Sequence, residues 1–142
     1  MKAESAMWKK IRPYLVAAKF DPVRVENPIH PGTPDVNLCT GDWIELKTIT
    51  DWPTKSHHTV IIRHFTNQQR VFLFKRWRAA YGTTHLLLEV RAAKQWLLFD
   101  GDVAAKIVGR ATVEGHRVNA HAVLGAHEIE KIPNLIVGRK GN

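Results

Sequence analysis

The feature that most constrains this chain is a pair of acidic residues, Asp35 and Glu45, on the two sides of a predicted tight β-hairpin. The loop is expected at residues 39–41, Cys-Thr-Gly, between two short runs with the alternation of strands. With this loop, Val36 pairs with Ile44 and Asp35 pairs with Glu45. Directly opposed side chains in a sheet have Cβ atoms roughly 5 Å apart, so the two carboxylates should face each other.

Lys47 places an ammonium group beside this pair. Successive strand residues point to opposite faces, so Glu45 and Lys47 share one face while Ile44 and Leu46 share the other. Two facing carboxylates destabilise a sheet, and one of them is pushed toward protonation. A divalent cation between them removes the conflict, and Mg²⁺ typically takes one or two carboxylates together with waters and phosphate oxygens. The hairpin therefore predicts a metal site next to a lysine.

Composition narrows the class of protein. The chain has 142 residues, which suits one domain, and 44% of them are hydrophobic, so it is not a disordered polymer. Its 21 basic and 13 acidic residues leave a net charge of +8, which favours a polyanionic partner through phosphate contacts. The single cysteine excludes an internal disulfide and fits a reducing compartment. No secretory signal or long apolar run is present, so we expect a cytoplasmic protein without a membrane span.

Helical spacing of apolar residues is found in three segments, which cover residues 3–19, 66–81 and 100–108. Pro13 should kink the first helix or split it in two. Gly82 should stop the second helix. Asp100 or Gly101 should cap the third.

Strands are expected between these helices, at residues 20–26, 84–91 and 95–99, in addition to the hairpin. The run over 84–91 is almost continuously apolar, as expected for a strand buried on both faces. A polar connection follows the hairpin and includes a further short strand at 60–62. The order of elements predicts an α/β fold in which helices flank a central mixed sheet.

The C-terminal part is weakly patterned. We therefore expect a single domain over residues 1–142, with a core over about 1–108 and an extension over 109–142.

These elements together resemble the PD-(D/E)XK nucleases, with Pro34-Asp35 as the PD and Glu45-Leu46-Lys47 as the (D/E)XK. The more specific resemblance is to the virus-type replication–repair nuclease branch, VRR-NUC. Its members read as Gly-x-Pro-Asp, a hairpin, Glu-Leu-Lys-Thr, and then a helix opened by a glutamine. The corresponding segments here are Gly32-Thr33-Pro34-Asp35, Glu45-Leu46-Lys47-Thr48 and Thr66-Asn67-Gln68-Gln69. The match covers roughly residues 1–100.

The resemblance implies a restriction-endonuclease-like core and metal-dependent hydrolysis of phosphodiester bonds. Asp35 and Glu45 would hold Mg²⁺ or Mn²⁺ together with the backbone carbonyl of Leu46. Lys47 would orient or activate the attacking water, or stabilise charge on the transition state. No organic cofactor is expected, because the chain has no P-loop, dinucleotide-binding or nucleophile motif.

Small stand-alone members of the branch resemble Holliday junction resolvases, which act as dimers on branched DNA. The leading hypothesis is therefore a homodimeric, structure-selective DNA endonuclease of repair or recombination. A compact basic nuclease of this kind suits a phage genome. Two alternatives remain: a nuclease that nicks or degrades DNA without regard to structure, and a catalytically inactive DNA-binding module on the same fold.

The resemblance adds two further candidates for the catalytic site. Members of the branch often add an acid from the first helix, and Glu4 is the corresponding residue here. The alternative is that Glu4 is simply an acid favoured at a helix N-terminus. The helix glutamine corresponds to Gln69, although Thr66-x-x-Gln69 is also a capping box. Two other acids lie near the motif. Asp42 is expected to close the hairpin turn, and Asp51 is interpreted as a loop residue, with a second acid of the site as the alternative.

Contacts with DNA phosphates are expected from basic residues on the second helix and in the connection before it. A solvated helix face and a plain polar loop are the alternatives. The candidates are Arg70, Lys75, Arg76, Arg78, Lys55 and Arg63. A structural zinc site is not expected, because His116, His121 and His127 are spaced by five and six residues, unlike common zinc arrangements.

Overall fold

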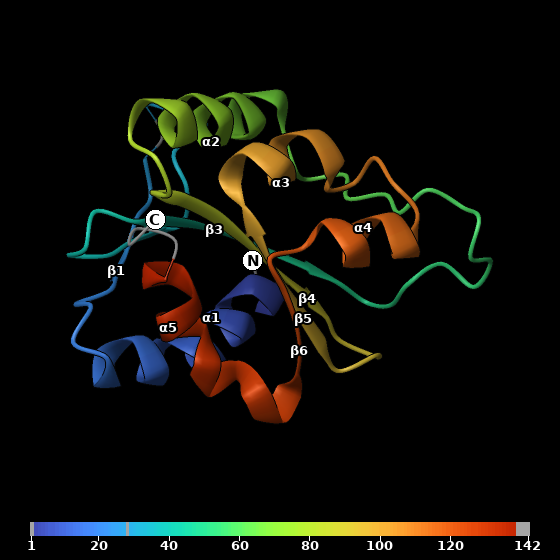
Figure 1. Cartoon of the computed structure of the whole chain (residues 1–142), viewed down its shortest axis with the longest axis horizontal. Coiled ribbons are helices and arrows are strands. Elements are labelled where there is room, and N and C mark those ends of the chain that lie inside the picture. The colour runs from blue at the N-terminus through green and yellow to red at the C-terminus, as the bar shows by residue number, and fades with distance from the viewer. Residues whose placement is uncertain (1, 28, 139–142) are drawn as a thin grey trace.

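The computed structural model describes residues 2–27 and 29–138, and over these residues a six-stranded mixed sheet forms the centre of the molecule (Figure 1). The strands lie in chain order across the sheet, and β3 and β4 are parallel while every other neighbouring pair is antiparallel. They are β1 (Val23–Arg24), β2 (Val36–Asn37), β3 (Trp43–Ile49), β4 (Thr84–Val90), β5 (Gln95–Asp100) and β6 (Ala122–Gly125). The expected α/β class with a central mixed sheet is confirmed.

Helices cover both faces of this sheet, and each face has its own hydrophobic core (Figure 1). One face packs against α1 (Lys2–Ala17), the 3₁₀-helix η1 (Ala126–Lys131) and α5 (Ile132–Val137). The other face packs against α2 (Asn67–Ala79), α3 (Gly101–Ile107) and α4 (Val113–Asn119).

Strand β4 separates the two cores. Leu87 points toward α1, whereas Leu86 and Leu88 point toward α2 and α3. All seven residues of β4 are buried, as its continuous apolar run predicted. β3 follows the same alternation, so Ile44 and Leu46 join the core under α1 while Glu45 and Lys47 point to the opposite face.

Helix α1 was expected to kink or split at Pro13, and the split does not occur, because a single helix runs through this position. Pro13 is exposed, so the ring and the carbonyl that it leaves unpaired lie on the solvent side of the helix, where water can satisfy the carbonyl. Met7, Ile11 and Leu15 form the buried stripe at spacings of four residues.

Two expected strands are wrong in extent or in kind. The strand over 20–26 is reduced to β1, because Lys19 and Asp21 adopt positive φ and interrupt the extended backbone just before it. The segment 60–62 forms no strand, although Val60 and Ile62 are buried and the Val60 N–H donates to the Ala111 carbonyl.

The boundary expected near residue 108 is also wrong, because residues after it complete the core. β6 pairs with β5 at the edge of the sheet, and Ile129, Ile132 and Ile136 are buried against the α1 face. His116 of α4 is fully buried, where it accepts a hydrogen bond from the Gly109 N–H and contacts the Thr112 carbonyl at 2.8 Å. Ile129, Ile132 and Ile136 are spaced by three and four residues, a helical pattern that the sequence analysis missed.

Candidate active site

The hairpin has the register that its sequence predicted. Val36 lies opposite Ile44, and the N–H of Leu38 donates to the carbonyl of Asp42 at 2.9 Å. Gly41 closes the turn at a φ of 92°, a conformation that glycine adopts without strain. Continuing this register places Asp35 opposite Glu45.

Strand β2 is short, and this leaves much of one edge of β3 unpaired. Within the described part of the chain, β2 pairs with Trp43 and Ile44 alone, so the edge of β3 from residue 45 onward has no described partner strand on this side. Asp35 Oδ2 accepts the N–H of Leu46 at 2.8 Å and so satisfies part of that edge. The N–H and C=O of one strand residue point to the same edge, so the Leu46 carbonyl also points toward Asp35.

Glu45 is the unusual group of the site. Its side chain is 1% exposed, and neither carboxylate oxygen has a hydrogen-bond partner among the described residues. Burial, and after it the negative charge of Asp35, raises the pKa of Glu45 to about 8, although Lys47 opposes the shift. A buried carboxylate without hydrogen bonds is costly, and a cation bound beside it would remove the cost.

Lys47 is held in place by the chain segment that precedes α2. Its ammonium group lies 3.2 Å from Glu45 Oε2 and donates to the backbone carbonyl of His64 at 2.8 Å. The side chain is almost fully buried and lies near the ring of Phe65. Lys47 therefore points at the carboxylate pair from a fixed position, as the sequence predicted.

Glu4 reaches the same region from the first turn of α1. Its Oε2 lies 3.2 Å from His64 Nε2, so α1 and the segment before α2 meet beside the open edge of β3. Burial and the Lys47 charge lower the pKa of His64, which favours the neutral imidazole. His64 was missed by the sequence analysis, and no signal could have revealed it, because its contact with Lys47 uses the backbone and its contact with Glu4 is long-range.

The donor set fits a hard divalent cation of the magnesium type. Over residues 2–27 and 29–138, no group of three or more His, Cys, Asp or Glu side chains is placed to hold a metal ion. Asp35, Glu45 and the Leu46 carbonyl would be the protein ligands of such a cation, and a set this small would leave room for the waters and phosphate oxygens that Mg²⁺ prefers. The unpartnered Glu45 oxygens are the observation that supports this fit.

Gln69 takes part in a capping box. The N–H of Thr66 donates to Gln69 Oε1 at 2.9 Å, and the N–H of Gln69 donates to Thr66 Oγ1 at 3.2 Å. The capping alternative from the sequence is confirmed. This arrangement uses the amide oxygen of Gln69 and also fixes the amide at the start of α2.

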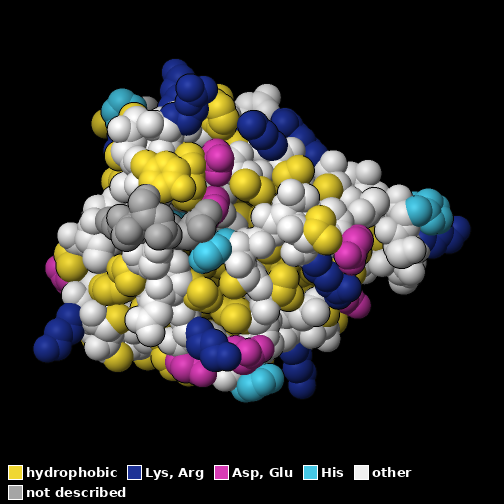
Figure 2. All heavy atoms as spheres, viewed as in Figure 1, with side chains coloured by type: hydrophobic (Ala, Val, Ile, Leu, Met, Phe, Trp, Pro, Cys, Tyr) yellow, Lys and Arg dark blue, Asp and Glu magenta, His cyan; other side chains and the backbone are white. Residues whose placement is uncertain are grey.

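The basic candidates divide into one structural arginine and a group of exposed residues. Arg70 donates to the carbonyl of Ala105 at 3.1 Å and lies over the ring of Phe65, so it joins α2 to α3. The others are exposed to solvent: Lys55, Arg63, Lys75, Arg76 and Arg78. Figure 2 shows Lys and Arg side chains projecting at separate points of one face, the uppermost of them over α2.

Asp42 does more than the expected closing of the turn. It is fully buried, and its Oδ1 lies 2.9 Å from Nε2 of the equally buried His85 on β4. The hydroxyl of Thr40 contacts the other carboxylate oxygen. Asp51, by contrast, is an exposed loop residue whose Oδ1 accepts a hydrogen bond from the N–H of Trp52.

Comparisons of the chain with the known protein families, with curated proteins and with solved structures find no match. Among the described residues, no helix has both the length and the apolar character that crossing a membrane requires.

Proposed function

We propose that this protein is a Mg²⁺- or Mn²⁺-dependent DNA endonuclease with a restriction-endonuclease-like core. The observation that carries the proposal is the buried carboxylate of Glu45, which faces Asp35 across the hairpin, accepts no hydrogen bond of good geometry from the described residues, and forms an ion pair with Lys47 at 3.2 Å. A merely structural ion pair would have its remaining oxygens satisfied by the protein.

Each residue of the site has a role that follows from its position. Asp35, Glu45 and the Leu46 carbonyl would hold the cation, which when bound would polarise the phosphodiester and activate water. Lys47 directs its ammonium group at the same point, where it would stabilise developing negative charge and orient the attacking water. The His64 carbonyl restrains Lys47, and Glu4 lies beside the His64 ring.

Structure-selective cleavage of branched DNA by a homodimer is the more specific form of the proposal. It rests on the resemblance to the VRR-NUC branch and on the net charge of +8. The protein would then act in DNA repair or recombination in the cytoplasm, and its gene would belong to a phage. A nuclease indifferent to DNA structure is the alternative within this class.

A DNA-binding module without catalysis is the alternative in another class. The complete set of Asp35, Glu45 and Lys47 argues against it. A module that only binds DNA gains nothing from two facing carboxylates, which repel both each other and the phosphates.

The test is a cleavage panel of duplex, single strand, flap and four-way junction, each with Mg²⁺, Mn²⁺ or EDTA. We expect metal-dependent cleavage of the branched substrates and none in EDTA, with Glu45→Gln as the inactive control. Equal cleavage of plain duplex would select the structure-indifferent nuclease. DNA binding without cleavage in any metal would select the binding module.

A further inference from the structure

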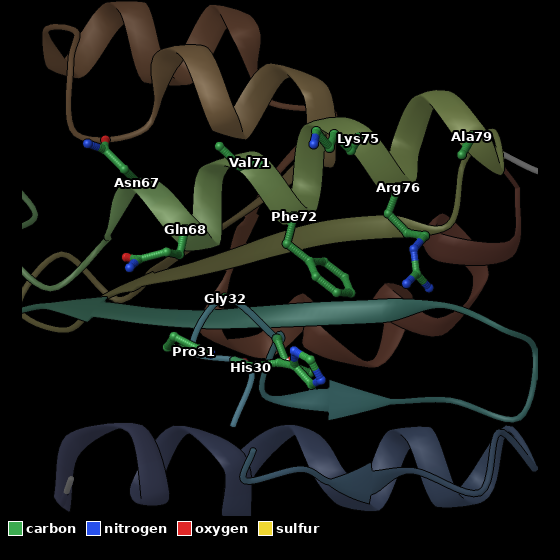
Figure 3. A pocket seen from close by; sticks show the side chains of 11 residues that line it. His30, Pro31, Gly32, Asn67, Gln68, Val71, Phe72, Lys75, Arg76 and Ala79 are labelled. Atoms are coloured by element: carbon green, nitrogen blue, oxygen red, sulfur yellow. Dashed lines mark hydrogen bonds between the residues drawn. The ribbon is translucent and has the colours of Figure 1, made fainter. Parts of the chain in front are cut away.

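A hollow lined by residues 30–33 and by α2 lies close in sequence to the candidate active site. It has a volume of about 700 Å³ and runs between residues 30–33 and the outer side of α2 (Figure 3). The size falls within the range of small-ligand sites. Phe72 and Arg76 point from α2 toward the loop, whose His30 and Pro31 form the facing wall (Figure 3). We call this hollow the α2 groove.

A glycine closes one end of the α2 groove. A Cβ atom added to Gly32 would lie 2.5 Å from the backbone oxygen of Gln68, so only glycine lets the loop approach the helix this closely. Gln68 places its amide at this end, whereas the amide of Asn67 points away from the loop (Figure 3). Amide side chains both donate and accept, which suits the polar edge of a nucleobase.

The walls combine rings, apolar surface and positive charge. Phe72 contacts Trp43 edge-on at a centroid distance of 5.8 Å, and a smaller hollow lined by Trp43 shares His30 and Phe72 with the groove. Lys75 and Arg76 stand along the helix side, and none of the described residues that line the groove is acidic. Aromatic rings next to cations are the usual means of holding an unstacked nucleotide, by base stacking and by phosphate contact.

The groove starts close to the carboxylate pair. Thr33 lines it and precedes Asp35 by two residues, a span of at most about 7 Å. Gln68, at the same end, precedes Gln69. A strand whose phosphate lies at the carboxylates would therefore bring a neighbouring nucleotide to the groove entrance.

We propose that the α2 groove is a binding site for one unpaired nucleotide of the DNA, next to the phosphate that is cleaved. Its base lies against Phe72, and its phosphate lies near Lys75 and Arg76. This inference rests on the proposed nuclease function and gives it a physical basis for selectivity. A base paired and stacked inside a duplex cannot enter the groove, whereas a base at a flap, a junction or a single strand can.

The test compares two matched valine variants. Val71 lines the groove and is 50% exposed, so Val71→Glu adds a negative charge there at little cost in folding. Val118 on α4 is 67% exposed and lies outside the groove, so Val118→Glu adds the same charge elsewhere. A second pair removes one positive charge. Arg76→Gln removes it from the groove, and its control, Lys9→Gln, removes it from α1. Thermal melts establish that all four variants are folded.

Binding is measured by fluorescence anisotropy in EDTA, so that no cleavage occurs, with a duplex, the same duplex carrying a short flap, and a single strand. We expect wild-type protein to bind the flapped and single-stranded DNA more tightly than the duplex. Val71→Glu should weaken these two complexes about tenfold and leave the duplex complex unchanged relative to Val118→Glu. A 2-aminopurine base in the flap should lose fluorescence on binding to the wild type but not to Val71→Glu.

Three results would overturn the proposal. One is equal affinity of the wild type for all three DNAs. Another is a loss in Val71→Glu no larger than in Val118→Glu. The third is displacement of the flapped DNA by polyglutamate but not by an unlabelled single strand, which would assign the groove to an acidic peptide. Cleavage without selectivity contradicts the groove alone, whereas selective binding without any metal-dependent cleavage contradicts the nuclease alone.

Discussion

Two buried acids near the start of β3 have opposite surroundings: Asp42 lies just before the strand, and Glu45 lies within it. Asp42 is fully buried, and both of its carboxylate oxygens are in contact with polar groups, His85 at 2.9 Å and the Thr40 hydroxyl. Glu45 is equally buried, yet neither of its oxygens has a hydrogen bond within the described chain. Three positions of sequence separate a satisfied carboxylate from an unsatisfied one.

The difference shows what a buried charge indicates about function. A buried acid that the protein itself satisfies is a structural element, covered here by Trp77 of α2, whose ring meets His85 edge-on. Glu45 is paired with Lys47 at 3.2 Å but is buried opposite a second acid, and these surroundings favour a proton or a bound cation on it. The four predictions below test this contrast.

The largest effect is expected on cleavage. Asp35→Asn keeps an acceptor for the Leu46 N–H but removes a charge from the cation site, and Lys47→Ala removes the fixed ammonium group. We expect each to lower the cleavage rate about 10⁴-fold, roughly 5.5 kcal/mol in the barrier, while DNA affinity stays within a few-fold of wild type. Single-turnover assays measure the rate, with Lys9→Gln as the control for loss of a lysine. A wild-type rate in either variant would contradict the site.

The next effect concerns stability and pH. Because the folded pKa of Glu45 is about 8 and its ordinary value is 4.5, the folded protein retains a proton that the unfolded chain releases between these values. The free energy of unfolding should therefore fall as pH rises from 4.5 to 8, by about 5 kcal/mol at most, and then level off.

Glu45→Gln cannot titrate and should lose this slope, so in EDTA it should be more stable than wild type at pH 8. Urea unfolding at several pH values measures the effect. Mg²⁺ should restore stability to the wild type only. Glu89→Gln on β4 is the control, because Glu89 is buried but paired with Lys10 at 2.7 Å. An unchanged slope in Glu45→Gln would mean that another group causes it.

The third effect is on the satisfied acid. Asp42→Ala leaves His85 buried without its partner, and breaking a buried pair in this way costs about 3–4 kcal/mol. We expect that loss in the free energy of unfolding, with the cleavage rate of the folded fraction unchanged. Urea titration measures the free energy of unfolding. The cleavage rate is measured at low temperature and divided by the fraction of folded protein. A large loss of cleavage rate in well-folded Asp42→Ala would mean that Asp42 and Glu45 both act in catalysis.

The smallest effect separates the two roles of Gln69. Thr66→Ala and Gln69→Ala each remove the capping box, so each should cost about 1 kcal/mol of stability. If the amide nitrogen of Gln69 also contacts the substrate, Gln69→Ala alone should reduce kcat, and we expect a reduction of about tenfold. Equal kcat in the two variants would leave Gln69 with the capping role only.

Local patterns predicted a substantial part of the fold and of the site. The three-residue loop and strict alternation were enough to place Asp35 opposite Glu45, because hairpin register follows from turn length. The apolar run predicted β4, and Thr66-x-x-Gln69 predicted the cap of α2. The outline of β1, the intact α1 and the core role of residues after 108 were not predicted, since each depends on which neighbouring surface happens to cover the segment.

The sequence by itself determined the hairpin, its acids and the lysine beside them, because these depend on residues that are near one another in the chain. Only the tertiary structure decided that Asp42 is satisfied by His85, that the His64 carbonyl holds Lys47, and that the loop at 30–33 forms a groove with α2. These contacts join segments far apart in sequence, and they form only when sheet and helices pack. Whether a buried acid is satisfied is a property of that packing, which no local pattern records.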